Sequence, residues 1–280
     1  GHDQGMLDAI QRHYKETEKW RMVVYPIEAT LPLGSETASK ISSLRRTLSR
    51  EELFRDIEAG SRLDGQYALL VFLSVIVAAI GLLQDNVAVV IGAMVIAPLL
   101  GPNLAFSFAT VMGDKGLILQ SAKTLLAGLA VSLSACFLLG LVWHGDMLVS
   151  NELIARTVIG YDMLVLALAS GAAAVLSMTG GLSAALVGVM VAVALLPPAA
   201  ASGLLAGAGE WGLSARAMLM LLANIVCVNI AAQLVFRMKG IKPRTWLERR
   251  SAIQSIRMTW KVWMGMLATI IALIFLLNTL

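Results

Sequence analysis

Long apolar stretches separated by short polar connections follow a polar opening that ends near residue 66. A helix needs about 20 apolar residues to cross a bilayer. By that measure the pattern predicts membrane-spanning helices in seven segments, at 67–83, 87–112, 117–143, 161–178, 182–208, 214–236 and 261–279. The apolar runs are long and continuous, whereas the strands of a membrane β-barrel alternate over about 10 residues, which excludes a barrel.

The second and fifth segments repeat one pattern. Residues 88–114 and 184–210 align without a gap, and the alignment pairs Gly92 with Gly188 at a shift of 188 − 92 = 96 residues. The match extends weakly into the neighbouring segments, so we expect two units of three segments, with the seventh outside the duplication. A duplicated hydrophobic segment interrupted by proline points to a transport site between two structural repeats.

Prolines lie in the middle of both copies. Pro98 and Pro102 flank Gly101 in the first copy, and Pro197 and Pro198 are adjacent in the second. Proline removes a backbone donor and clashes with the carbonyl four residues earlier, so we expect each segment to open into two half-helices. Pro102 and Pro198 are each expected to start the second half-helix of their copy.

The opened helices supply the candidate site. Free N–H groups at the start of a half-helix carry partial positive charge and favour an anion or the negative end of a polar solute, whereas freed carbonyls favour a cation. In lipid, irregular backbone persists only where protein buries it or water reaches it. The candidate substrate-binding residues are Gly101, Pro102, Asn103, Ser107, Pro197, Pro198 and Ser202.

Polar residues elsewhere in the apolar segments have simpler interpretations. Asn229 and Gln233 are four residues apart on the sixth segment and share a helix face. They either line a pathway or bridge neighbouring helices, and bridging is the favoured interpretation. Asp85, in the turn after the first segment, is the best-placed acid for a proton or cation role, but a plain loop acid is favoured.

Basic residues gather in two regions and predict the orientation. One group precedes the first segment, the other lies between the sixth and seventh, and both are expected in the cytoplasm. Six crossings between them would make the second repeat inverted, while re-entrant proline segments would leave four crossings and parallel copies. The connection at 144–162 carries few positive charges, which favours an outside position and the inverted repeat.

Composition and charge exclude several classes of protein. Hydrophobic residues make up 58% and charged residues 14% of the chain, against roughly 25% charged residues in soluble domains. The net charge of +4 reflects orientation and gives no nucleic-acid partner. Cys136 and Cys227 lie in apolar runs, and the three histidines are scattered, so we expect no metal, no cofactor and no enzyme activity.

The domain organisation follows from these patterns. The polar cytoplasmic region contains an extended segment at 21–33 and a surface helix at about 50–63. A basic amphipathic stretch precedes the last segment, and small residues on the apolar faces favour a homo-oligomer. The expected parts are 1–66 (polar region), 67–143 (first membrane repeat), 161–236 (second membrane repeat), 237–260 (basic amphipathic segment) and 261–279 (additional membrane helix).

The residues around the first proline core resemble a known family. Residues 86–94, NVAVVIGAM, run into Pro98-Leu99-Leu100-Gly101-Pro102, and residues 48–236 as a whole are similar to the prokaryotic family called domain of unknown function 389. The resemblance implies a polytopic protein of a prokaryotic inner membrane. It supplies no activity, substrate or site.

Two hypotheses for the function remain open from the sequence. The first is an all-α transporter or channel for a small polar solute or ion, with a 3+3 inverted repeat, a proline-broken second segment in each copy and a site between the copies. The second is a membrane scaffold or sensor that transports nothing and whose duplicated core serves packing alone. In both, the lipid bilayer is a partner.

Overall fold

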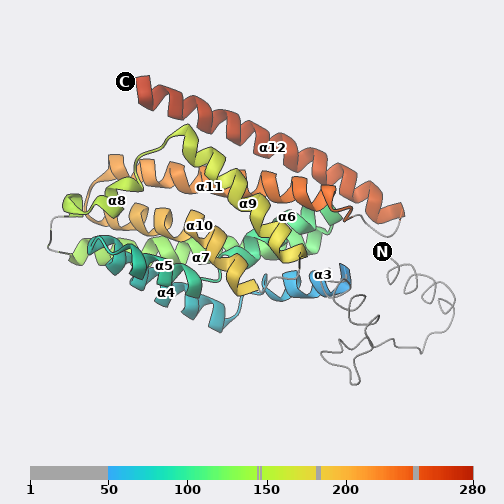
Figure 1. The fold of residues 1–280 in the computed structure, drawn as a ribbon, viewed down its shortest axis with the longest axis horizontal. Coiled ribbons are helices and arrows are strands. Elements are labelled where there is room, and N and C mark those ends of the chain that lie inside the picture. The colour runs from blue at the N-terminus through green and yellow to red at the C-terminus, as the bar shows by residue number, and fades with distance from the viewer. Residues whose placement is uncertain (1–49, 144, 146, 181–183, 242–245, 280) are drawn as a thin grey trace, which may run out of the picture.

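The computed structural model describes residues 50–143, 145, 147–180, 184–241 and 246–279, and this part of the chain is helical without a strand (Figure 1). The all-α class is therefore confirmed. A short 3-10 helix, η1 (Met147–Val149), precedes α8. The α-helices are α3 (Arg50–Ala59), α4 (Gly65–Leu83), α5 (Val87–Ile96), α6 (Leu100–Met112), α7 (Lys115–Val142), α8 (Asn151–Ala155), α9 (Tyr161–Thr179), α10 (Ala184–Gly207), α11 (Trp211–Met238) and α12 (Trp246–Thr279).

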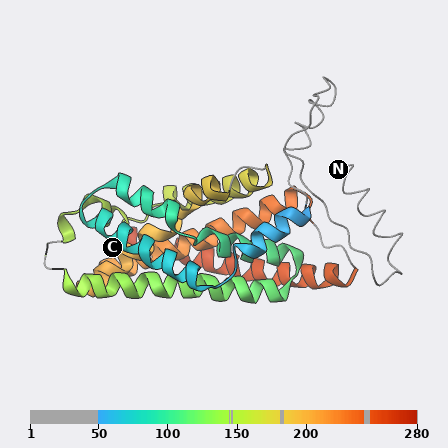
Figure 2. The ribbon, with the colours of Figure 1, turned by 90° about the horizontal axis from the view of Figure 1, so that it is seen from below.

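The long helices run back and forth along one common axis (Figures 1 and 2). Helix α10 is central and contacts α4, α5, α6, α7, α9 and α11. Helix α12 lies along the edge, against α6 and α11. The α4–α5 turn and α8 are at one end of the bundle, and α3 is at the other (Figure 1).

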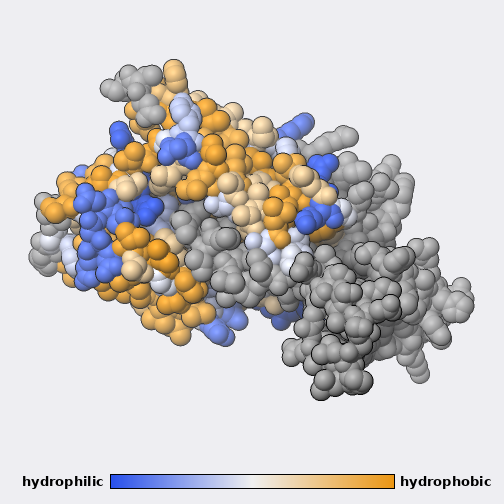
Figure 3. Space-filling model, in the orientation of Figure 1, coloured by the Kyte–Doolittle hydropathy of each residue, from blue (hydrophilic) through white to orange (hydrophobic). Residues whose placement is uncertain are grey.

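The surface of the bundle suits lipid. Five helices are long and apolar enough to cross a membrane, namely α4, α7, α9, α11 and the Thr259–Leu277 part of α12, and the bent pair α5–α6 makes a sixth. Leu126, Val165 and Phe275 are 66%, 66% and 62% exposed, and hydrophobic residues cover much of the face in Figure 3. So large an apolar surface is unfavourable in water, which identifies a multi-pass membrane protein.

Six of the seven predicted segments correspond to candidate membrane spans among the described residues, and the count of seven spans is not confirmed. Alongside the five long helices and the bent pair, the fifth predicted segment supplies a shorter apolar stretch, Leu195–Gly207, in α10. The predicted surface helix at 50–63 is α3, which ends at Ala59. The predicted extended segment at 21–33 lies outside the described residues.

Side chains just before the helices set where the helices begin. Asp64, Asn86 and Asp114 each accept a hydrogen bond from the backbone N–H three residues later, at 2.7, 3.2 and 3.0 Å. Such caps satisfy donors that the first turn leaves free. Gly113 and Gly209 follow α6 and α10 with φ of 75° and 85°, where a side chain would be strained.

Glycines bring α7 and α10 into backbone contact. A Cβ added to Gly203 would lie 2.6 Å from the Cβ of Cys136. One added to Gly207 would overlap the carbonyl oxygen of Phe137, and one added to Gly140 would overlap the carbonyl oxygen of Leu204. This small-residue spacing lets helices in lipid approach closely and gain packing energy.

Helix α3 docks against the start of the second half of the bent pair. Phe54 of α3 meets Phe108 of α6 edge to face with ring centroids 5.9 Å apart, and Phe108 meets Phe236 of α11 at 5.4 Å. After α3, the carbonyl of Ser61 accepts a hydrogen bond from Thr124 Oγ1 of α7 at 2.8 Å. Helix α3 and the residues just after it are thus fixed to α6 and α7.

Helix α12 joins two regions that the sequence separates. Residues 246–260 of the predicted amphipathic segment and the predicted last span form one helix of 34 residues, whereas residues 237–238 of that segment end α11. At about 1.5 Å per residue α12 is about 51 Å long, more than the bilayer core of about 30 Å. Part of α12 therefore extends beyond the hydrocarbon.

Candidate functional site

The first proline core breaks its helix as predicted. Helices α5 and α6 meet at an angle of 53°. Ala97 has a ψ of 119° because proline disfavours the helical region for the residue before it, which here precedes Pro98. Helix α6 resumes at Leu100, so the prediction that Pro102 starts it is wrong. Pro102 lies within the first turn, where its missing N–H removes no bond within the helix.

The second proline core does not break its helix, so the prediction of a break in each copy is wrong. Helix α10 is continuous through Pro197 and Pro198. The deciding difference is the position equivalent to Pro98, at 98 + 96 = 194, where the second copy has alanine and keeps its N–H. Residues 195–200 are all buried, and this packing supports a helix that lacks two donors.

Four buried side chains form a row between α6 and α11, the polar ladder: Asn103, Ser107, Asn229 and Gln233. Asn229 Nδ2 donates to Asn103 Oδ1 at 2.6 Å and to the carbonyl of Ile225 at 2.8 Å. Ser107 Oγ donates to Asn229 Oδ1 at 2.6 Å. Gln233 lies one turn further along α11 on the same face. All four side chains are at most 1% exposed.

Three amide atoms of the polar ladder have no hydrogen-bond partner among the described residues. They are Asn103 Nδ2, Gln233 Nε2 and Gln233 Oε1. Leaving a buried polar group unsatisfied costs about 1–3 kcal/mol, and most buried polar groups in native proteins are satisfied. The polar ladder is therefore a place where a polar molecule would complete bonds that the protein leaves open.

The predicted site residues of the first copy converge on this ladder. Asn103 and Ser107 both bond to Asn229, and Gly101 and Pro102 lie in the turn of α6 just before Asn103. A Cβ on Gly101 would overlap the carbonyl oxygen of Gly60, so glycine is required where the chain after α3 crosses α6.

The predicted site residues of the second copy are arranged differently. Ser202 Oγ donates to the carbonyl of Ser214 at 3.1 Å, and Ser214 Oγ donates back to the carbonyl of Ser202 at 2.8 Å. This pair fastens α10 to the start of α11. Pro197 and Pro198 lie buried inside α10, and the helix around them is continuous. They therefore produce no break like the one between α5 and α6.

Two residues of the polar ladder were absent from the predicted site. Asn229 bridges α11 to α6, as the favoured interpretation of the amide pair states. Gln233 has no such bridge among the described residues. The four-residue spacing of the two amides was the available signal, but only the packing of α6 against α11 shows that they continue the row begun by Asn103.

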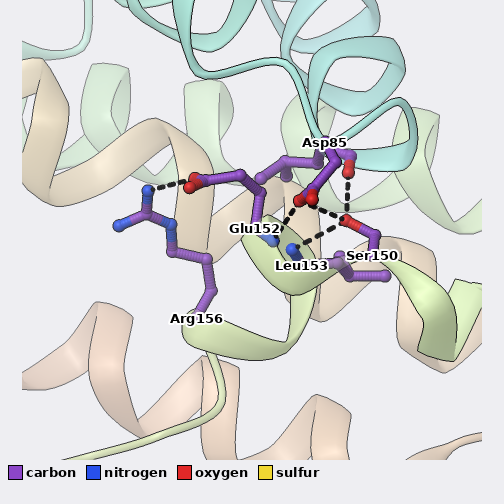
Figure 4. A network of polar contacts seen from close by, with 6 residues as sticks. Asp85, Ser150, Glu152, Leu153 and Arg156 are labelled. Carbon is purple, nitrogen blue, oxygen red and sulfur yellow. Dashed lines mark hydrogen bonds and ion pairs between the residues drawn. The ribbon is translucent and has the colours of Figure 1, made fainter.

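Asp85 is a structural acid in the turn between α4 and α5, where it faces the start of α8 (Figure 4). Its φ is 55°, and its Oδ1 accepts the backbone N–H of Glu152 at 2.7 Å while Oδ2 accepts Asn151 Nδ2 at 3.0 Å. These bonds, the Glu152 N–H first, lower the pKa of Asp85 below its ordinary value. Ser150 Oγ also donates to the carbonyl of Leu82, which fastens α8 to the end of α4.

We expect Asp85→Asn to lower the melting temperature most near neutral pH. Asparagine tolerates the positive φ but loses the charge that accepts these bonds. Because the folded pKa is depressed, the stabilisation is present above the unfolded pKa of about 3.9 and is lost as pH falls through the lower folded value. Melting curves from pH 7 to 3 should show the difference from the parent shrinking below about pH 4; a constant difference would contradict this, with Asp162→Asn as the control.

Comparison with known proteins finds a family region that includes Asn103, Ser107 and Asn229 and ends before Gln233. A family model with the description Domain of unknown function (DUF389) matches residues 94–230. The chain is 34% identical over 269 residues to the Uncharacterized protein MJ0678 of Methanocaldococcus jannaschii, across 96% of this chain and 83% of that protein. No solved structure matches the chain.

Proposed function

This chain belongs to the family described as Domain of unknown function (DUF389), and we propose that it is a membrane transporter or channel for a small polar solute or ion. The polar ladder carries the proposal. It places three unpartnered amide atoms at the core of an apolar bundle, beside a broken helix. Polar groups inside a membrane protein are expensive and mark substrate pathways.

The helix bounds support a 3+3 repeat. Adding 96 to the bounds of α4, 65 and 83, gives 161 and 179, the bounds of α9. Adding 96 to those of α7, 115 and 142, gives 211 and 238, the bounds of α11. The glycines at φ 75° and 85°, Gly113 and Gly209, also differ by 96.

Contacts between the two copies support an inverted relation. Each copy has three successive passes, and α4 runs in the opposite direction to α9 in Figure 1. Ser107 contacts the carbonyl of Asn229, and a Cβ on Gly203 would lie 2.8 Å from the carbonyl of Leu133. Since 107 + 96 = 203 and 133 + 96 = 229, equivalent positions meet in the α6–α11 and α10–α7 pairs. A pseudo-two-fold axis between inverted copies produces this reciprocity.

We propose that the two reciprocal contacts have different roles. The α7–α10 contact is closed by glycine packing and holds the copies together. The α6–α11 contact holds the polar ladder, which is at most 1% exposed, so it admits a solute only when α6 moves relative to α11. This movement is the alternating access expected of repeat-built transporters. The setting is a prokaryotic inner membrane with the polar opening of the chain in the cytoplasm.

Cysteine labelling tests this proposal without knowledge of the substrate. In a background with Cys136→Ala and Cys227→Ala, Ser107→Cys should react with a small polar thiol reagent in membranes. Ser74→Cys in α4 is the matched control, because both serines are 0% exposed. We expect Ser107→Cys to label about tenfold faster, since only the polar ladder becomes accessible during alternation.

Equal protection of both cysteines would overturn the transport proposal. It would favour the scaffold hypothesis, in which the polar ladder only bridges α6 and α11. Labelling of Ser107→Cys from the two sides of oriented vesicles would add support, because alternation exposes one position to both faces in turn.

A further inference from the structure

The hydrogen-bond inventory of the polar ladder restricts what it binds. Asn229 Nδ2 uses both of its hydrogens, one on Asn103 Oδ1 and one on the carbonyl of Ile225. Asn229 Oδ1 accepts from Ser107. The unpartnered set is therefore one complete carboxamide, Gln233, with a donor and an acceptor, and one extra donor, Asn103 Nδ2.

The bundle offers no charge to balance an ion at this place. Among the residues whose burial the structure describes, the buried polar side chains are Ser, Thr, Asn and Gln, and none is acidic or basic. In the same part of the chain no group of three or more His, Cys, Asp or Glu could hold a metal ion. An ion stripped of water here would face only neutral groups, and burying an unpaired charge is far more costly than burying a neutral polar group.

The mixed donor and acceptor set also disfavours both signs of charge. An anion would bond to Gln233 Nε2 and Asn103 Nδ2 but would be repelled by Gln233 Oε1. A cation would bond to Gln233 Oε1 but would be repelled by the two amide nitrogens. A neutral molecule with a carbonyl beside an N–H satisfies both atoms of Gln233, because an amide pairs with a carboxamide through two parallel hydrogen bonds.

We propose that the polar ladder binds and conducts a small uncharged solute of the amide or urea type, with its carbonyl on Gln233 Nε2 and its N–H on Gln233 Oε1. This inference rests on the proposed transport function and specifies its substrate class. Asn103 Nδ2, on the other helix of the polar ladder, supplies a further donor to the solute along its path.

Urea flux into proteoliposomes tests the inference. Stopped-flow light scattering under a urea gradient should show entry at least about tenfold faster than in empty liposomes, with no potassium or chloride flux above that of empty liposomes. Gln233→Met keeps the size of the side chain and removes both hydrogen-bonding atoms, so it should fold at least as well as the parent while urea entry falls about tenfold.

The matched control is Gln120→Met in α7. Gln120 bonds to Ser61 at 3.2 Å, outside the polar ladder, so the same substitution should leave urea entry within about twofold of the parent. Urea entry that survives Gln233→Met would overturn the inference.

The remaining outcomes separate this inference from the transport proposal. Ion flux without urea flux would overturn the uncharged class and keep transport. Labelling of Ser107→Cys with no urea flux would overturn the amide class and likewise keep a pathway. No flux of urea, potassium or chloride, together with protection of Ser107→Cys, would overturn both.

Discussion

Replacing Gly207 with alanine is expected to destabilise the protein by about 2–3 kcal/mol, the upper range for overpacking a core. A Cβ at this position would overlap the carbonyl oxygen of Phe137 and would lie 2.9 Å from the Cα of Gly140. Both are backbone atoms of α7, so no rotamer change can relieve the overlap. The two helices would have to separate along their whole contact. Unfolding in mixed detergent, followed by circular dichroism, measures the loss.

Gly92→Ala is the matched control, and its expected effect on stability has the opposite sign. Gly92 lies inside α5, and no atom lies within 4 Å of an added Cβ. Alanine has the higher helix propensity, so this variant should be neutral or more stable by about 0.5–1 kcal/mol. If the two variants unfolded alike, the α7–α10 contact would not be the backbone-close interface described above.

This contact explains why the second copy of the repeat differs from the first. In the sequence, both copies offer a candidate site, since each has two prolines in the middle of its apolar segment and a serine a few residues later. In the structure, the equivalent of Ser107 is Gly203, which lies against α7 with no space for a side chain. In the proposed repeat, the α7–α10 contact would therefore serve packing, and the α6–α11 contact keeps the polar groups.

Local chemistry explains which parts of the fold were predictable. Hydropathy and the capping residues Asp64, Asn86 and Asp114 determine helix positions through bonds within a few residues, so the segments were found to within a few positions. The break before α6 was predictable because Pro98 acts on its immediate neighbour, Ala97. Each of these effects is encoded in adjacent residues.

Contacts between distant residues explain what the sequence could not give. A proline inside a helix is tolerated or not according to the packing around it, and the buried setting of Pro197 becomes visible only when α10 is placed among the six helices that it contacts. The meeting of Asn103 with Asn229, 126 residues later, likewise depends on the packing of α6 on α11. The sequence therefore identified both asparagines but did not show that they form a hydrogen bond with each other.

Two proline substitutions are expected to have opposite effects. Pro98→Ala frees Ala97 to become helical, so α5 and α6 should straighten and Asn103 should move away from Asn229. We expect urea entry to fall at least about tenfold and the protein to lose about 1–3 kcal/mol of stability, because Asn103 Oδ1 and one N–H of Asn229 lose their buried hydrogen bond. Spin labels at Val87 and Lys115 should move apart by about 4 Å as the 53° bend opens.

Pro197→Ala should instead stabilise the protein and leave transport intact. A proline inside a helix costs about 3 kcal/mol relative to alanine. The substitution also removes two buried ring methylenes, which lowers the stability by about 1.6 kcal/mol. The variant is therefore expected to be more stable than the parent by about 1 kcal/mol. The distance between labels at Val87 and Lys115 should not change. Loss of urea entry in Pro197→Ala would mean that the proline of α10 takes part in transport, and the asymmetry between the two copies would then be wrong. If urea entry were retained in Pro197→Ala and lost in Pro98→Ala, the helix break that transport needs would be that of the first copy alone.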